Sequence, residues 1–164
     1  MKAATAKEIK TELSNQSPED LMKICLRLSR FKKENKELLT YLLYESDNEH
    51  NYVESVKREI DTQFEQINTK TYYFIKKGVR KILRIAKKYI RYSQNKETEV
   101  EILLYFCQKM KEFRPSISRN KVLKGIFSKQ IERIQTLIKK LHEDLQYDYE
   151  QRIGELINFD YLRR

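Results

Sequence analysis

Glycine and proline are scarce in this chain, and their scarcity limits its fold more than any other feature. Among 164 residues there are three glycines and two prolines. A β-sheet needs turns between its strands, and the residues that favour such turns are nearly missing. Leu, Ile, Lys, Glu, Gln and Arg, which suit helices, dominate instead. The sequence therefore predicts a single all-α domain over residues 1–164, with seven to eight helices.

The helices are expected to stack as antiparallel hairpins. Residues 21–31, LMKICLRLSRF, match residues 82–92, ILRIAKKYIRY, in residue character at an offset of 61. This match suggests an internal duplication with units of about 17–69 and 70–146, and a C-terminal capping helix at about 148–162. Two such units predict a HEAT-like or armadillo-like stack, and a closed helical bundle is the alternative.

Capping patterns predict where several helices begin. Three pairs have the spacing of a capping box: Thr5 with Glu8, Asn51 with Glu54, and Thr98 with Glu101. Ser17 followed by Pro18 predicts another start, because serine caps a helix and proline suits its first position. The polar run 46–50 predicts a loop after the third helix, and Pro115 predicts the end of the sixth.

Apolar residues at helical spacing predict core positions. In the third helix these residues are Leu38, Leu39, Leu42 and Leu43. Cys25 and Cys107 lie within apolar helical faces, so we expect two buried, reduced thiols. Gly78 lies alone inside a helical pattern, where glycine costs about 1 kcal/mol relative to alanine. We therefore expect close helix packing at this glycine, in preference to a hinge.

Nothing in the sequence suggests secretion or membrane insertion. The start, MKAATAKEIK, lacks the apolar region of a signal peptide. The longest uninterrupted apolar run, residues 102–107, is far shorter than the roughly 20 residues that span a bilayer. We therefore expect a cytoplasmic protein without a membrane-inserted segment.

The beginning of the chain carries a family resemblance. A short helix is followed by SPEDLMKICLRL and then by the Lys- and Glu-rich KENKELLTYLL. This pattern, over about the first 45 residues, resembles small uncharacterised bacterial all-helical domains. The resemblance implies an all-α fold and carries no function to this chain.

The most basic stretch is residues 70–92, KTYYFIKKGVRKILRIAKKYIRY, which carries nine Lys and Arg residues and no acidic residue. At 100° per residue, an apolar arc and a basic arc lie on opposite sides of a helix. The apolar arc holds Ile75, Val79, Ile82, Leu83, Ala86, Tyr89 and Ile90. The stretch therefore predicts a helix whose apolar face is central to the core and whose other face holds positive charge.

Aromatic residues and a second basic region accompany this helix. Tyr73 falls within the basic arc and Tyr92 at its edge, as in sites where unpaired bases stack on aromatic rings. Residues 114–140 hold eight Lys or Arg residues and one acidic residue. If the two regions expose neighbouring faces, they form one surface. The candidate nucleic-acid- or anion-binding residues are Lys77, Arg80, Arg84, Lys87, Lys88, Arg91, Tyr73, Tyr92, Lys121 and Lys124.

Patterns typical of catalysis and metal binding are missing. His50 and His142 have no second His or Cys at ligand spacing. The three glycines are isolated, so they make no phosphate-binding loop. We expect no enzyme activity, no catalytic or metal-binding residues and no cofactor.

Binding remains, with three interpretations. The basic helix suits a phosphate polymer, and RNA is favoured over DNA because no helix-turn-helix signature is present. Alternatively, a groove between helical hairpins holds an acidic or amphipathic protein partner. In the third interpretation the basic face is only solvated, and the acidic flank of the preceding helix neutralises part of it. That flank holds Glu54, Asp61 and Glu65. The sequence does not indicate an oligomeric state.

Overall fold

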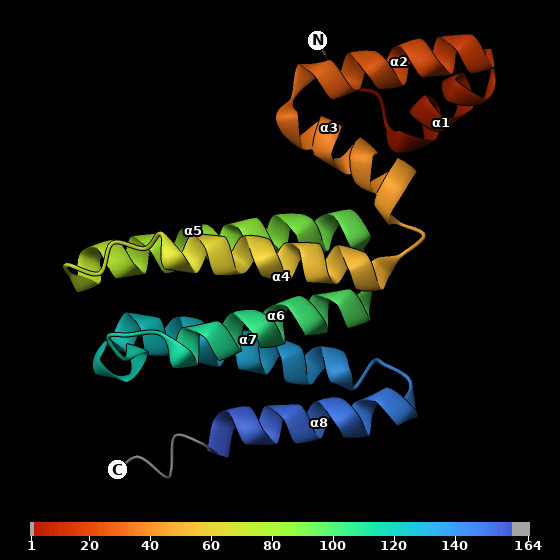
Figure 1. Ribbon diagram of the computed structural model, residues 1–164. Helices are drawn as coiled ribbons and strands as arrows, with labels where there is room; N and C mark the ends of the chain where they lie inside the picture. The colour runs from red at the N-terminus through yellow and green to blue at the C-terminus, as the bar shows by residue number, and fades with distance from the viewer. Residues whose placement is uncertain (1, 159–164) are drawn as a thin grey trace. The chain divides into compact units, whose positions relative to one another are not determined.

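The computed structural model describes residues 2–158, and within them it is all helical (Figure 1). The α-helices are α1 (Ala6–Ser14), α2 (Pro18–Phe31), α3 (Lys33–Thr40), α4 (Glu49–Glu65), α5 (Tyr72–Ser93), α6 (Lys96–Glu112), α7 (Lys121–Ile138) and α8 (Glu143–Asn158). A π-helical turn, Tyr41–Glu45, follows α3, and a 3-10 turn, Ile117–Arg119, precedes α7. The predicted all-α class and number of helices are confirmed.

The chain divides into two compact units, with the boundary between Tyr44 and Glu45. We call them the N-terminal unit, with α1 to α3, and the C-terminal unit, with α4 to α8. The sequence predicted one domain and placed a duplication boundary between residues 69 and 70. The structural boundary lies elsewhere, in a stretch where neither glycine nor proline marks a linker. The duplication stays a prediction.

The first two helices of the N-terminal unit begin where capping predicts. The Thr5 backbone N–H donates to the Glu8 carboxylate at 2.7 Å, and the Glu8 N–H donates to the Thr5 hydroxyl, which completes the capping box. Ser17 accepts from the Asp20 N–H at 3.1 Å, and Pro18 is the first residue of α2. Local hydrogen bonds account for both starts.

The N-terminal unit nevertheless has almost no core. Tyr41 is the one buried side chain among residues 2–44, and α2 packs on α3. The predicted burial of Leu42, Leu43 and Cys25 was wrong, because all three are exposed. Amphipathic spacing predicts which side of a helix is apolar, but a single layer of short helices supplies nothing to cover it.

Helix α6 is the centre of the C-terminal unit. Helices α4, α5 and α6 contact one another, α7 packs on α6, and α8 packs on α7. Eight of the 17 residues of α6 are buried, namely Thr98, Val100, Ile102, Leu103, Leu104, Phe106, Cys107 and Met110. The charged residues Glu99, Glu101 and Lys109 of the same helix pair with the helices around it. The apolar face of α5 belongs to the same core, because Ile75, Val79 and Ala86 are completely buried.

Two predicted capping residues of this unit have other roles. Asn48, not Asn51, caps α4, and it accepts from the Asn51 N–H at 3.1 Å. Asn95, not Thr98, caps α6 by accepting from the Glu97 N–H at 2.9 Å. The Thr98 hydroxyl instead donates to the Glu49 carboxylate, a contact between α6 and α4. The Thr98 side chain therefore makes a tertiary contact and does not cap its own helix.

Ion pairs join α6 to the helices around it. The Glu101 carboxylate accepts from Arg152 and from the Tyr149 hydroxyl of α8, and it lies 3.3 Å from the Lys57 ammonium of α4. Burial raises the pKa of Glu101, but Arg152, Lys57 and Tyr149 outweigh burial and hold that pKa at about 2. Glu101 therefore binds α4, α6 and α8 together as a carboxylate.

The C-terminal part of the chain forms two helices with a break between them. Helix α7 stops at Ile138, and α8 begins at Glu143. Tyr149 and Ile153 of α8 are buried. The predicted capping helix at about 148–162 corresponds to α8 up to Asn158, and its last four residues lie outside the described part. Among residues 2–158 no helix has the length and apolar character to cross a bilayer.

Candidate polyanion-binding site

The basic helix forms as predicted, with one buried and one charged face. Its buried residues are Ile75, Val79, Ile82, Ala86, Ile90 and Tyr92. The spacing of the first five matches the 3.6-residue period of a helix. The helix ends at Gln94, whose φ of 56° is left-handed. Its 22 residues extend about 33 Å at 1.5 Å per residue.

The opposite face of α5 carries cations that form no ion pair with any carboxylate of residues 2–158. This basic face, as we call it, consists of Lys76, Lys77, Arg80, Lys81, Arg84, Lys87 and Arg91. Six of these residues are exposed and Lys76 is half-buried. Within residues 2–158 none of the seven forms an ion pair. Their positive charge is therefore directed at solvent.

Within residues 2–158 the acidic flank of α4, Glu65 included, forms no ion pair with the basic face. Asp61 lies 2.8 Å from the Lys109 ammonium and accepts from the Tyr105 hydroxyl at 2.7 Å, and both partners belong to α6. Glu54 lies 2.8 Å from Lys57 of its own helix. These two carboxylates are thus paired with cations of α4 and α6, and the cations of α5 keep their charge.

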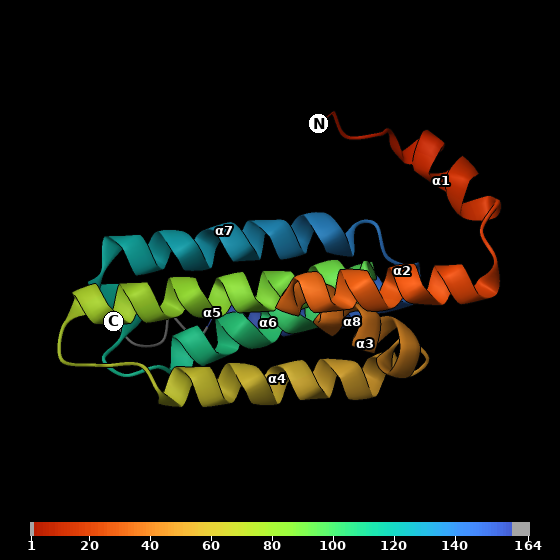
Figure 2. The ribbon, with the colours of Figure 1, turned by 90° about the horizontal axis from the view of Figure 1, so that it is seen from above.

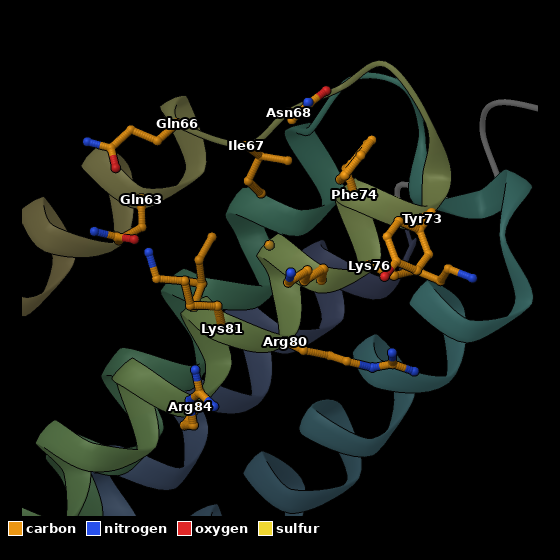
Figure 3. Close-up of a pocket in the computed structure, with 13 residues that line it drawn as sticks. Gln63, Gln66, Ile67, Asn68, Tyr73, Phe74, Lys76, Arg80, Lys81 and Arg84 are labelled. Carbon is orange, nitrogen blue, oxygen red and sulfur yellow. The ribbon is translucent and has the colours of Figure 1, made fainter.

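A groove runs along the first half of the basic face (Figure 3). Its volume is about 640 Å³, and α4, the turn after α4 and α5 all contribute to it. The residues that line this cationic groove are Gln63, Gln66, Ile67, Asn68, Tyr73, Phe74, Lys76, Lys77, Gly78, Arg80, Lys81, Ile82 and Arg84. Five of them are cations, and no carboxylate is among these described residues. The lining of the groove is therefore positively charged.

Close packing at Gly78 forms the floor of the groove. A Cβ atom on Gly78 would lie 2.9 Å from Cγ1 of Ile67, closer than such atoms approach. Glycine therefore lets Ile67, in the turn after α4, lie directly on α5. Close packing is present at this glycine as predicted, but the turn after α4 supplies it in place of a helix.

The groove reaches the beginning of α5, where two aromatic residues lie. Tyr73 is 65% exposed and Phe74 is 41% exposed, with ring centroids 5.4 Å apart in an edge-to-face arrangement. The first turn of α5 contains no acidic residue, and the Thr71 side chain does not cap it. The positive end of the helix dipole therefore adds to the charge of the cations there.

The predicted site residues of α5 fall into three groups. Tyr73, Lys77, Arg80 and Arg84 line the groove. Lys87 and Arg91 extend the basic face beyond it, exposed to solvent.

Lys88 and Tyr92 form the third group, at the other end of α5. The Lys88 ammonium lies 4.7 Å from the centroid of the Tyr89 ring and 6.0 Å from that of Tyr92. Tyr92 is only 8% exposed, so its ring is not open to a base, and its prediction as a binding residue is corrected. Edge-to-face contacts from Tyr89 to both Tyr52 and Tyr92 make this end of α5 an aromatic cluster of the core.

Lys121 and Lys124 are exposed on α7 and do not line the groove. Helices α5 and α7 both pack on α6, and they begin at the same end of the unit (Figure 1). The Tyr72 hydroxyl donates to the Ser116 carbonyl at 3.1 Å, which ties the start of α5 to the segment before α7. Figure 2 shows α4 and α7 on either side of α5. The second basic region therefore begins near the start of α5, and Lys121 and Lys124 stay outside the groove.

Several groove residues were missed by the sequence reasoning. Lys76 and Lys81 lie at the two margins of the basic arc, and a wider arc would have included them. Gln63, Gln66 and Asn68 come from α4 and the turn after it, and only the packing of that turn on α5 brings them to the groove. No local pattern marks these amides.

Among the described residues, no group of three or more His, Cys, Asp and Glu side chains is arranged to hold a metal ion. No protein-family model, curated protein or solved structure matches this chain. The function is therefore argued from the site alone.

Proposed function

We infer that the C-terminal unit is a non-enzymatic module that binds a phosphate polymer, most concretely RNA, through the basic face of α5. One observation carries this proposal. Seven cations lie along one side of a 22-residue helix, and none of them pairs with a carboxylate within residues 2–158. Exposed cations of a folded domain commonly lie among carboxylates, so a one-sign face favours an anionic partner.

The physical basis of binding is the release of counterions from the polymer. Each phosphate that a Lys or Arg neutralises frees part of the ion atmosphere around the nucleic acid. From Lys77 to Arg91 the basic face extends about 21 Å along the helix, enough to meet several phosphates. Phosphate contacts of this kind do not depend on sequence. The module is therefore expected to bind RNA without strong sequence preference.

Charge reversal within the groove tests the proposal. The double variant Lys77→Glu/Arg84→Glu changes two exposed groove cations, so it is expected to keep the fold. Its affinity for a labelled, mixed-sequence single-stranded RNA, measured by fluorescence anisotropy at low salt, should fall at least about tenfold. The salt dependence should weaken by about one per lost phosphate contact.

A matched control distinguishes the effect of the basic face from the effect of the protein's net charge. Lys10→Glu/Arg58→Glu makes the same change in total charge at two exposed residues that do not line the groove. It should keep most of the affinity. Equal losses in both double variants would mean that net charge alone attracts the RNA, and an absence of binding by the unaltered chain would overturn the proposal.

A second candidate function concerns the N-terminal unit and a protein partner. Large apolar side chains are exposed on α2 and after α3, namely Met22, Leu26, Leu28, Phe31, Leu42 and Leu43. Large apolar side chains exposed in contiguous patches commonly mark interaction surfaces, and this unit exposes the six just named. A protein partner bound there should survive a high-salt wash and be lost with Leu28→Ser/Phe31→Ser. Release of the partner by salt alone would count against this function.

A further inference from the structure

We propose that the cationic groove takes a single-stranded polynucleotide and that a base of this strand stacks on Tyr73. This inference rests on the proposed function and makes it more specific, because a basic face alone does not distinguish one phosphate polymer from another. The distinction comes from the uncharged residues of the groove. They offer an aromatic ring and amide groups next to the cations.

The Tyr73 ring is placed to accept a base. It is 65% exposed, although it belongs to the first turn of a well-packed helix. Its edge-to-face contact with Phe74, at 5.4 Å between centroids, leaves at least one face of the tyrosine ring uncovered. In Figure 3 the ring lies on the same side of α5 as Lys76 and Arg80. A base on Tyr73 would therefore have its own phosphate close to cations.

Amide side chains lie on the other side of the groove, around Gln63 and Gln66 (Figure 3). The Gln63 amide nitrogen donates to Glu59 at 3.0 Å, which leaves its carbonyl oxygen to accept. The Asn68 carbonyl accepts from the Lys70 N–H at 2.9 Å, which leaves its amide nitrogen to donate. These groups offer both donors and acceptors for the edge of a base. A polymer without bases would leave them unused.

The size of the groove favours a single strand over a duplex. Its volume of about 640 Å³ lies in the range of pockets that hold small organic molecules, about 300 to 1,000 Å³. One or two nucleotides fit such a volume, whereas a double helix can only lie across its mouth. In a duplex the faces of the bases are also stacked on each other, so Tyr73 would have no base to receive.

The test compares a single-stranded oligothymidylate with an abasic oligonucleotide of the same length, which has the same backbone charge but no bases. Affinities of the full chain are measured by fluorescence anisotropy at one salt concentration. Stacking on an aromatic residue contributes about 1 to 3 kcal/mol per base, which is roughly 5- to 150-fold in affinity. We expect oligothymidylate to bind at least fivefold more tightly, and Tyr73→Ala to abolish that preference.

Two further variants make the result specific to this ring. Tyr147, on α8, is also 65% exposed and lies outside the groove, so Tyr147→Ala should keep the preference. Tyr73→Phe keeps an aromatic ring at this position and should also keep the preference for oligothymidylate. Equal affinity for the two oligonucleotides, or equal effects of Tyr73→Ala and Tyr147→Ala, would overturn the stacking proposal.

That failure differs from a failure of the proposed function. If the abasic oligonucleotide and inorganic polyphosphate bind as tightly as oligothymidylate, the polyanion proposal stands and the single-strand proposal falls. If none of the three binds at low salt, both proposals fall.

Discussion

Replacing Glu101 with glutamine should destabilise the C-terminal unit by about 3 kcal/mol at neutral pH. Glu101 is 19% exposed, and it bonds to Arg152 and Tyr149 of α8 while it pairs with Lys57 of α4. These contacts, set against burial, lower the pKa of Glu101 from an ordinary 4.5 to about 2. A difference of this size between unfolded and folded states corresponds to about 3 kcal/mol.

The effect has a defined pH window. A carboxylate whose pKa is lower in the folded state stabilises the fold above its unfolded pKa, and this contribution is lost as the pH falls through the folded value. The difference in free energy of unfolding between the unaltered chain and Glu101→Gln should therefore be full near pH 7. It should shrink as the pH falls from about 4.5 toward 2.

Urea unfolding followed by circular dichroism at several pH values measures this difference. Glu99→Gln serves as the control, because Glu99 is on the same helix and pairs with Arg133 of α7, which is half exposed. Glu99 bonds to one cation, whereas Glu101 bonds to Arg152 and Tyr149 and pairs with Lys57, so Glu99→Gln should cost less than Glu101→Gln. The reasoning fails if the two variants lower the free energy of unfolding by the same amount. It also fails if the loss caused by Glu101→Gln does not become smaller in acid.

Other predictions concern packing and local stability. Gly125→Ala should stabilise the protein by up to about 1 kcal/mol in urea unfolding, because a Cβ there has no neighbour within 4 Å. Gly78→Ala should give no such stabilisation, because its Cβ would clash with the Ile67 side chain. A thiol reagent should modify Cys25 in the native protein and reach Cys107 only after unfolding, since burial raises the pKa of Cys107 to about 12. Amide hydrogens of α1 to α3 should exchange faster than those of α6, because those three helices bury no side chain. Slow exchange in α2, or rapid labelling of both thiols, would contradict this view of the two units.

Local rules account for the helical class and for several helix boundaries. Thr5 and Ser17 cap their helices through residues three positions away, so the sequence alone was enough to place them. Thr98 has the same local pattern, but its hydroxyl bonds to Glu49, 49 positions earlier in the chain. A partner so distant in sequence becomes available only when the tertiary structure forms.

The candidate site divides in the same way. The cations of α5 follow from helical periodicity, because one face of the helix must be buried. The amides of Gln63 and Gln66 reach the groove only because the turn after α4 packs on Gly78. Tyr92 lies at the edge of the basic arc, where periodicity does not decide between burial and exposure. Its contact with Tyr89 decides the question in favour of burial.

The salt dependence of RNA binding tests the central claim most directly. If the five cations of the groove each neutralise a phosphate of a single strand, the logarithm of affinity should fall with the logarithm of salt concentration with a slope of about −3.5. Between about 50 and 200 mM salt this amounts to roughly a 100-fold loss of affinity. A slope near zero, or no detectable binding at the lower salt concentration, would contradict the assignment of α5 as a polyanion-binding helix.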